Sequence, residues 1–179
     1  MLVDPIDIAD PALDAATRDA AANEAARAGR VTNMKRTLLR SLPAFTLFND
    51  VLPLKASLRD AIGNRAVSVF SHAISEDAGC LLCSTYFRKA LIEDGVSLQD
   101  FTPTAEEEDL IALAAVIASP GRTVDATLQR RLSARYPQKT LLELVAYGAA
   151  MLATNVLNTT LDVPLDVDLE RFRAEPAVA

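Results

Sequence analysis

Two cysteines, separated by two leucines in the run Cys80-Leu81-Leu82-Cys83, are the only thiols of this 179-residue chain. Side chains three positions apart on a helix share one face, with roughly 5–6 Å between their Cβ atoms, and a disulfide can span that separation. Such a pair can pass between dithiol and disulfide with little backbone movement. The spacing therefore points to thiol redox chemistry, either reduction of a peroxide or disulfide exchange.

Two other interpretations of the pair have to be weighed against redox chemistry. A buried free cysteine often acts as a small hydrophobic residue, and Leu81 and Leu82 make this stretch apolar, so the pair could simply pack in a core. Zinc is disfavoured, because a structural site needs four ligands and the chain offers two cysteines and one histidine, His72. We therefore expect neither a metal nor a cofactor.

The position of the pair on a helix would affect its reactivity. Asp77 is a plausible N-cap for a helix that passes through both cysteines to Glu93 and ends at Gly95. That cap would place Cys80 in the first turn and Cys83 one turn further on. Unpaired N–H groups and the partial positive charge of a helix N-terminus favour the thiolate.

A peroxidase cycle also needs groups that move protons. Glu76 lies four residues before Cys80 and His72 eight before it, and the two would share a helix face only if that helix continued through Ser75. We take Cys80, Cys83, Glu76 and His72 as candidate catalytic residues. Each of the last two has a plain alternative, since a lone histidine on an apolar stripe is often a core residue and a carboxylate often ends a helix.

Tyr86, three residues after Cys83, could place its hydroxyl beside the second thiol, although a core or interface role is equally in keeping with its type.

Nearly every segment outside this motif also predicts a helix, and none shows the alternation of a strand. The fold class is therefore all-α, with residues 1–29 as an N-terminal helical arm and residues 30–173 as a single domain. We expect the final residues to fray. The first half is predicted to hold Pro11–Ala28, which has a thin apolar face and stops at Gly29, a helix from Thr32 or Asn33 to Pro43, a short helix with Phe45, Phe48 and Leu52, a helix from Pro53 to Gly63, and a stripe from Val67 to Ile74. The second half is predicted to hold a helix with a capping box at Thr104 and Glu107 and a stop at Ser119-Pro120-Gly121, a helix marked by Val124, Leu128 and Leu132, a long apolar helix to about Asn158, and a final turn from Asp168 to Arg173. The long helix opens at Pro137 or at Thr140, where Thr140 and Glu143 make a second capping box.

Composition narrows the functional classes. The net charge is −6, which argues against nucleic acid as a partner. No signal peptide is apparent, and residues 141–157, the most apolar stretch, are too few and too polar for a comfortable membrane span. We expect a cytoplasmic protein with no membrane partner, and in the cytoplasm a CxxC pair is more often reactive than structural.

The long apolar helix bears on assembly. It is apolar nearly all round, which predicts burial on most sides. A monomer of this size has difficulty surrounding such a helix, so a homo-oligomer is favoured over a central helix in a monomer.

The order of features resembles a known superfamily over residues 30–168. These features are Asn33-Met34 with Pro43, the helix containing Cys80-Leu81-Leu82-Cys83, Gly95, the polar helix start at Thr104 to Asp109, the helix through Ala153-Thr154-Asn155, and Leu161-Asp162-Val163-Pro164-Leu165-Asp166. Together they look like the AhpD-like, carboxymuconolactone decarboxylase superfamily. The resemblance implies an all-α fold that assembles into homo-oligomers such as dimers, trimers or hexamers.

The two branches of that superfamily imply different activities. In the AhpD branch the CxxC pair reduces alkyl hydroperoxides and is re-reduced by a lipoylated partner protein. The decarboxylase branch is a lyase that acts on a lactone and does not require the pair; Arg65 and Arg88 could contribute to binding a carboxylated lactone here. A third possibility is a non-catalytic, ligand-binding member. The leading prediction is a thiol-dependent oxidoreductase that reduces peroxides through a Cys80/Cys83 cycle, with a protein reductant as partner.

The sequence departs from the AhpD pattern at both relay positions. The resemblance places a glutamate twelve residues before the first cysteine, where this chain has Ser68, and a histidine four after the second, where it has Phe87. Only Cys80 and Cys83 carry over. That Glu76 and His72 replace the relay is a hypothesis based on their nearness in sequence.

Overall fold

The computed structural model describes residues 2–119 and 121–174, and all regular structure in these two stretches is helical, which confirms the all-α prediction. The predicted stop at Pro120 and the predicted fraying of residues 175–179 lie outside the described residues. In chain order the helices are α1 (Ala15–Ala28), α2 (Asn33–Leu38), α3 (Leu42–Asn49), α4 (Leu52–Ile62), α5 (Asn64–Asp77), α6 (Leu81–Glu93), α7 (Ala105–Ala118), α8 (Ala126–Arg135), α9 (Gln138–Leu161) and the 3₁₀-helix η1 (Val167–Phe172).

Several predicted end signals are confirmed. Gly29 ends α1 with a φ of 78°, in the left-handed region that glycine reaches without strain. The Thr32 side chain accepts the N–H of Lys35 and caps α2. Thr104 and Glu107 form the predicted capping box of α7, each side chain bonding the backbone N–H of the other.

Two predicted end signals are wrong. The helix expected to end at Pro43 already ends at Leu38, and the short helix expected after Pro43 begins before it, at Leu42, because Ser41 caps α3 and Pro43 lies in its first turn, where its missing N–H costs nothing. Of the two predicted starts of the long helix, Pro137 is confirmed, since α9 begins at Gln138, and the capping box at Thr140 therefore does not form. The Glu143 carboxylate instead accepts hydrogen bonds from Ser57 and pairs with Lys139 at 2.8 Å.

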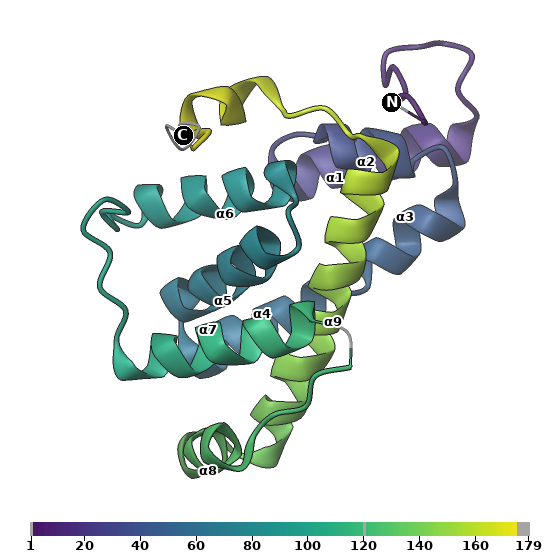
Figure 1. Ribbon diagram of the computed structural model, residues 1–179. Coiled ribbons are helices and arrows are strands. Elements are labelled where there is room, and N and C mark those ends of the chain that lie inside the picture. The colour runs from purple at the N-terminus through teal and green to yellow at the C-terminus, as the bar shows by residue number, and fades with distance from the viewer. Residues whose placement is uncertain (1, 120, 175–179) are drawn as a thin grey trace.

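The main core surrounds α5. In Figure 1, α6 and α7 lie on either side of α5, and the long α9 runs across them, in agreement with the packing of α5 against α6, α7 and α9. Phe70 and Ile74 of α5 are completely buried against Tyr147 of α9 and other apolar side chains. Gly148 permits this approach, since a Cβ there would stand 2.6 Å from the Ile117 side chain of α7. The long helix is thus central to the core.

A second apolar cluster joins the N-terminal segment to the fold. Ile6 and Ala21 are buried with Leu38, Leu39 and Phe45 of the α2–α3 region. The contact is modest, as the thin apolar face of α1 predicted, but it sets α1 beside α2 and α3 (Figure 1).

One side of α9 stays uncovered, so the helix is not buried on most sides within a single chain. Leu142, Val145 and Val156 are 70%, 48% and 57% exposed there. By length and composition alone α9 could cross a membrane, and among the described residues it is the one helix of which this is true. The expectation that this stretch is too polar for a span is thus not met by α9, although its contacts with α4, α5, α6, α7 and α8 are those of a core helix, which passes the same test.

Candidate thiol site

The connection between α5 and α6 sets the position of the cysteines. α5 does not stop at Ser75 but continues to Asp77, so the predicted N-cap role of Asp77 is wrong. Gly79 adopts a φ of 65°, its N–H donates to the Glu76 carbonyl at 3.0 Å, and the N–H of Cys80 donates to the Ser75 carbonyl at 3.0 Å. These two bonds form a Schellman motif, which ends one helix and turns the chain directly into the next.

Cys80 itself takes the N-cap position of α6, so this helix begins one turn later in the chain than predicted. Its Sγ accepts the backbone N–H of Cys83 at 3.4 Å, and its carbonyl accepts the first helical bond, from Ser84, at 2.9 Å. The sulfur therefore does what a serine or aspartate oxygen does at other N-caps. An N–H donor aimed at sulfur favours the thiolate over the thiol.

The two thiols hold their protons unequally. Hydrogen bonds from the Cys83 thiol, from the Cys83 backbone and from the Thr159 hydroxyl lower the pKa of Cys80 to about 6. Donation to Cys80 and burial raise the pKa of Cys83 well above its usual range. The pair thus loses one proton readily and holds the other between two sulfurs. Asn158 of α9 donates its Nδ2 to Cys83 Sγ at 3.2 Å, which supports negative charge on that sulfur.

Each thiol borders a different opening. At least 96% of the surface of each cysteine is buried, so a reagent has to enter such an opening to reach either thiol. Cys83 borders a pocket of about 470 Å³, which we call the Cys83 pocket. Cys80 borders a separate pocket of about 150 Å³, with Gly79, Leu81 and Thr159 around it. Asn158 lines both.

Aromatic side chains and one cation shape the Cys83 pocket near the thiol. Tyr86 and Phe87 of α6 meet edge to face with 5.1 Å between ring centroids. The Lys55 ammonium of α4 lies 5.1 Å from the Phe87 ring centroid and 5.8 Å from that of Tyr86. Tyr147 also lines the pocket, and its hydroxyl lies 2.9 Å from that of Ser71. Burial raises the pKa of Tyr147 above its usual range, so this phenol stays protonated.

Solved structures share this architecture. The chain superposes on the debrominase Bmp8 with a TM-score of 0.75 at 17% identity over 96% of both chains. An uncharacterized peroxidase-related protein from Silicibacter sp. TM1040 gives 0.74 at 12% identity over 97% of both chains. The chain has the AhpD-like helical fold.

A third structure, of a cysteine-to-alanine variant of Bmp8 in complex with 2,3,4-tribromopyrrole, has a TM-score of 0.75 at 16% identity over 96% of this chain and 95% of that one. No family model and no curated protein matches the sequence. The likeness confirms, at the level of fold, the superfamily resemblance drawn from the sequence.

Within this AhpD-like fold the predicted relay pair is brought together, but away from the openings to the thiols. Because α5 continues through Ser75, His72 and Glu76 share a face, with 3.8 Å between Nε2 and Oε1. Burial lowers the pKa of His72, against the opposing effect of Glu76. Neither residue lines the Cys83 pocket or the Cys80 pocket. Their relay role stays a prediction.

The two positions where the resemblance expects relay residues hold groups that do not titrate. Ser68 is buried in α5, and Phe87 lines the Cys83 pocket. Arg65 and Arg88, considered for a lactone carboxylate, line neither thiol pocket; Arg65 is paired with Glu107 at 2.6 Å.

Sequence reasoning missed Lys55 and Asn158. Asn158 had a detectable signal in the sequence, an amide in a mostly apolar helix, and the structure buries it. Nothing in the α4 sequence distinguishes Lys55 from a surface lysine.

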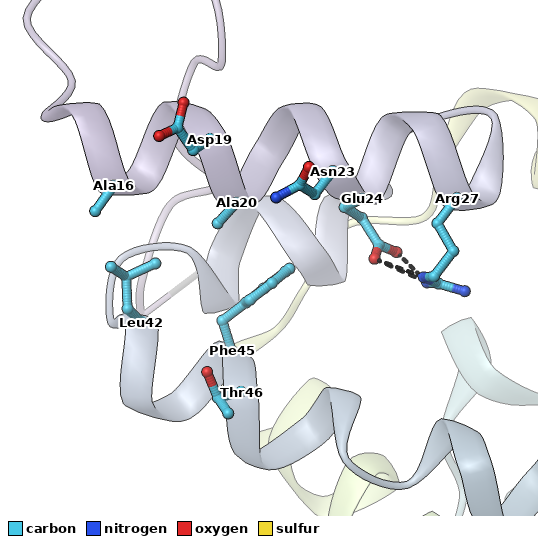
Figure 2. A pocket seen from close by; sticks show the side chains of 9 residues that line it. All are labelled: Ala16, Asp19, Ala20, Asn23, Glu24, Arg27, Leu42, Phe45 and Thr46. Atoms are coloured by element: carbon cyan, nitrogen blue, oxygen red, sulfur yellow. Dashed lines mark hydrogen bonds and ion pairs between the residues drawn. The ribbon is translucent and has the colours of Figure 1, made fainter.

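A pocket between α1 and α3, about 530 Å³ in volume, holds no thiol (Figure 2). Its walls combine alanines with Asp19, Asn23 and Phe45, and the Glu24–Arg27 ion pair at its end also borders the Cys83 pocket. No group of three or more His, Cys, Asp or Glu side chains that could hold a metal occurs in the described part of the chain.

Proposed function

We propose that the protein is a thiol-dependent oxidoreductase that reduces an organic hydroperoxide by cycling Cys80 and Cys83 between dithiol and disulfide. One observation carries the proposal: Cys80 caps α6 with its sulfur, which accepts the backbone N–H of Cys83, and Cys83 itself borders a pocket of about 470 Å³, large enough for a small molecule. A pair used only for packing would need neither the thiolate-stabilising bonds nor the opening.

Cys83 is proposed as the attacking thiol and Cys80 as the resolving one. Cys83 can transfer its proton to Cys80 along the hydrogen bond between the two side chains, and the Asn158 amide then stabilises the Cys83 thiolate. That thiolate attacks the outer oxygen of the hydroperoxide, the O–O bond breaks, and the alcohol leaves with a proton. Cys80 then attacks the sulfenic acid and water leaves, so two thiols and ROOH give a disulfide, ROH and water.

A protonated group at the Cys83 pocket can serve the alcohol that leaves. Tyr147 lines this pocket and keeps its proton because burial raises its pKa. Re-reduction of the disulfide by a protein-borne dithiol, and a cytoplasmic location, stay part of the proposal.

Thiol counting tests the proposal. Native reduced protein is titrated with a coloured disulfide reagent before and after one equivalent of cumene hydroperoxide, and again after unfolding. We expect two thiols to be lost, one equivalent of alcohol to form and dithiothreitol or dihydrolipoamide to restore both thiols. Thiols that react only after unfolding and ignore the hydroperoxide would exclude the function.

A second candidate function is removal of a halogen from an aromatic ring. Two observations favour it: the aromatic walls of the Cys83 pocket, and the likeness to Bmp8, named a debrominase. The dithiol would supply two electrons and a proton, giving the disulfide, the dehalogenated ring and bromide. Incubating reduced protein with 2,3,4-tribromopyrrole decides it, since bromide release equal to thiol loss supports the activity and no release excludes it.

The uncovered side of α9 supports the predicted homo-oligomer. Its exposed apolar residues continue into a groove lined by Ala149, Leu152, Ala153 and Val156. Sedimentation velocity should show an oligomer for the wild type and a smaller species for Val156→Arg. A wild-type monomer at micromolar concentration would remove this part of the proposal.

A further inference from the structure

The Cys83 pocket has a charge opposite to that of the chain. The net charge of the protein is −6, yet five cations line this pocket against two carboxylates. The cations are Arg27, Arg30, Lys35, Lys55 and Arg59, and the acids are Glu24 and Asp166. The entrance to the thiol is therefore more positive than the surface around it, which attracts anions.

Three of these cations already have partners. Arg27 pairs with Glu24 at 2.7 Å, Arg30 pairs with Asp168, and Lys35 donates to the Asn49 side chain. Because these three side chains already bond other residues, they have fewer free N–H groups to offer a ligand.

Lys55 differs from these three, because no carboxylate or amide oxygen among the described residues bonds its ammonium. Arg59 also has no ion pair there, but it is exposed to solvent, whereas Lys55 is partly buried. Its ammonium rests over the rings of Tyr86 and Phe87, and its charged neighbour is another cation, Arg59. Burial and Arg59 together lower the pKa of Lys55, as expected where no described carboxylate compensates its charge. A partly buried ammonium without a counter-ion gains more from a bound anion than an exposed one does.

Most of the remaining lining is apolar, although Thr32, Thr154 and Asn158 also border the pocket. Met34, Phe48, Leu52 and Met151 line the pocket with the two rings, so the body of a ligand meets hydrocarbon and aromatic surface. Phe87, on which Lys55 rests, follows Cys83 by four residues, one helical turn or about 5.4 Å along the axis of α6. A ligand that reaches both the ammonium and the sulfur needs a body on the order of one aromatic ring in length.

We propose that the Cys83 pocket binds small apolar molecules that carry a carboxylate, and that Lys55 pairs with this carboxylate while the apolar body extends toward Cys83. The proposal deepens the thiol-oxidoreductase function above and rests on it for the reaction at the far end of the ligand. It assigns Lys55 a role in substrate selection that does not depend on which bond the thiol breaks.

Binding of an unreactive acid and its neutral ester tests the proposal without any turnover. We expect 4-isopropylbenzoate to bind the reduced full-length protein at least tenfold more tightly than its methyl ester by calorimetry, with the difference shrinking as salt is added. Lys55→Met should abolish the difference and Lys55→Arg should retain most of it. Lys139→Met is the matched control, since Lys139 is 72% exposed and lies outside the pocket.

Reactive probes connect the binding to the chemistry. Cumene hydroperoxide and its para-carboxylate differ only in the anionic group, and we expect the carboxylate to have the lower KM in the wild type but not in Lys55→Met. If neither hydroperoxide oxidises the thiols while the acid–ester difference still depends on Lys55, the proposed function fails and this inference stands. Equal binding of acid and ester by the wild type overturns the inference whatever the turnover, and so does a difference in affinity that survives Lys55→Met. If Lys55→Met does not fold, the difference between acid and ester in the wild type and its dependence on salt decide the question.

Discussion

The groups that bond the Cys80 sulfur lie mostly in its own stretch of chain, with Thr159 of α9 as the exception, whereas the partners of Cys83 include residues from helices distant in sequence. Gly79, the end of α5 and the first N–H groups of α6 fix the Cys80 sulfur as a helix cap. Cys83 faces α4 through Lys55 and α9 through Asn158. Local geometry thus sets which thiol ionises, and tertiary packing sets which thiol meets a substrate.

The largest effect expected from this comparison is at Cys83. Cys83→Ser should lose hydroperoxide turnover completely, because the remaining thiol borders only the smaller pocket. Cys80→Ser should also fail to cycle but should still react once and stop as a sulfenic acid on Cys83, trapped by dimedone and located by mass spectrometry. A dimedone adduct on Cys80 in Cys83→Ser, with sustained turnover, would reverse the assignment.

The ionisation of the pair should be the next largest difference from an ordinary thiol. With the pKa of Cys80 near 6, ultraviolet thiolate absorbance and the rate of iodoacetamide alkylation should rise around pH 6 rather than around 9.0, the ordinary value. At neutral pH this amounts to roughly a hundredfold more thiolate. Cys80→Ser should move the transition of the remaining thiol upward.

Stability should follow the same titration. Between about pH 6 and 9.0 the unfolded chain binds a proton at Cys80 that the folded chain has released, so the free energy of unfolding of the reduced protein should rise with pH. Above 9.0 the slope should reverse, because folded Cys83 keeps a proton that the unfolded chain loses. Urea unfolding across this range, with Cys80→Ser as the control that lacks the lower rise, measures both slopes.

Asn158→Asp should have a smaller effect, about tenfold. The substitution removes the N–H donor to Cys83 and adds a negative charge beside it, which raises the pKa of the pair and slows alkylation at neutral pH. Asn155→Asp is the matched control, because Asn155 is also fully buried on α9 but bonds Ser75 and lines neither thiol pocket. Equal slowing in both variants would mean that general destabilisation, not the bond to Cys83, is responsible.

Gly79→Ala should cost about 1–2 kcal/mol, because the left-handed conformation opposes a Cβ even where space is free. Gly95→Ala is a close control: Gly95 has a φ of 81° and ends α6 with the same pair of Schellman bonds. Both variants should lose similar stability in urea unfolding, but only Gly79→Ala should also slow alkylation of Cys80. A thiol reactivity unchanged in both would show that the Schellman turn does not hold the Cys80 sulfur in place.

The contrast between local contacts at Cys80 and tertiary contacts at Cys83 also explains what could be predicted from the sequence. Helix class, the stop at Gly29 and the capping box at Thr104 follow from local rules and are confirmed. The start of α6 was misplaced because aspartate is a common N-cap type, which made Asp77 the expected cap. The actual start combines a Schellman turn at Ala78-Gly79 with a sulfur cap by Cys80, and cysteine rarely caps helices. Lys55 could not be found, because only packing brings α4 over Phe87.

The smallest effect is expected at the pair that sequence proximity suggested. Glu76→Gln and His72→Gln should leave hydroperoxide turnover within about twofold of wild type, because neither side chain lines the Cys83 pocket or the Cys80 pocket and a general acid or base must lie within hydrogen-bond reach of the reacting group. Steady-state kcat and KM with cumene hydroperoxide, measured for these two variants and for Lys55→Met, compare the His72–Glu76 pair with the Cys83 pocket. A tenfold loss in kcat for either variant, with unchanged unfolding, would place the proton relay on α5 and require the thiols to receive their protons through the helix interface rather than from the Cys83 pocket.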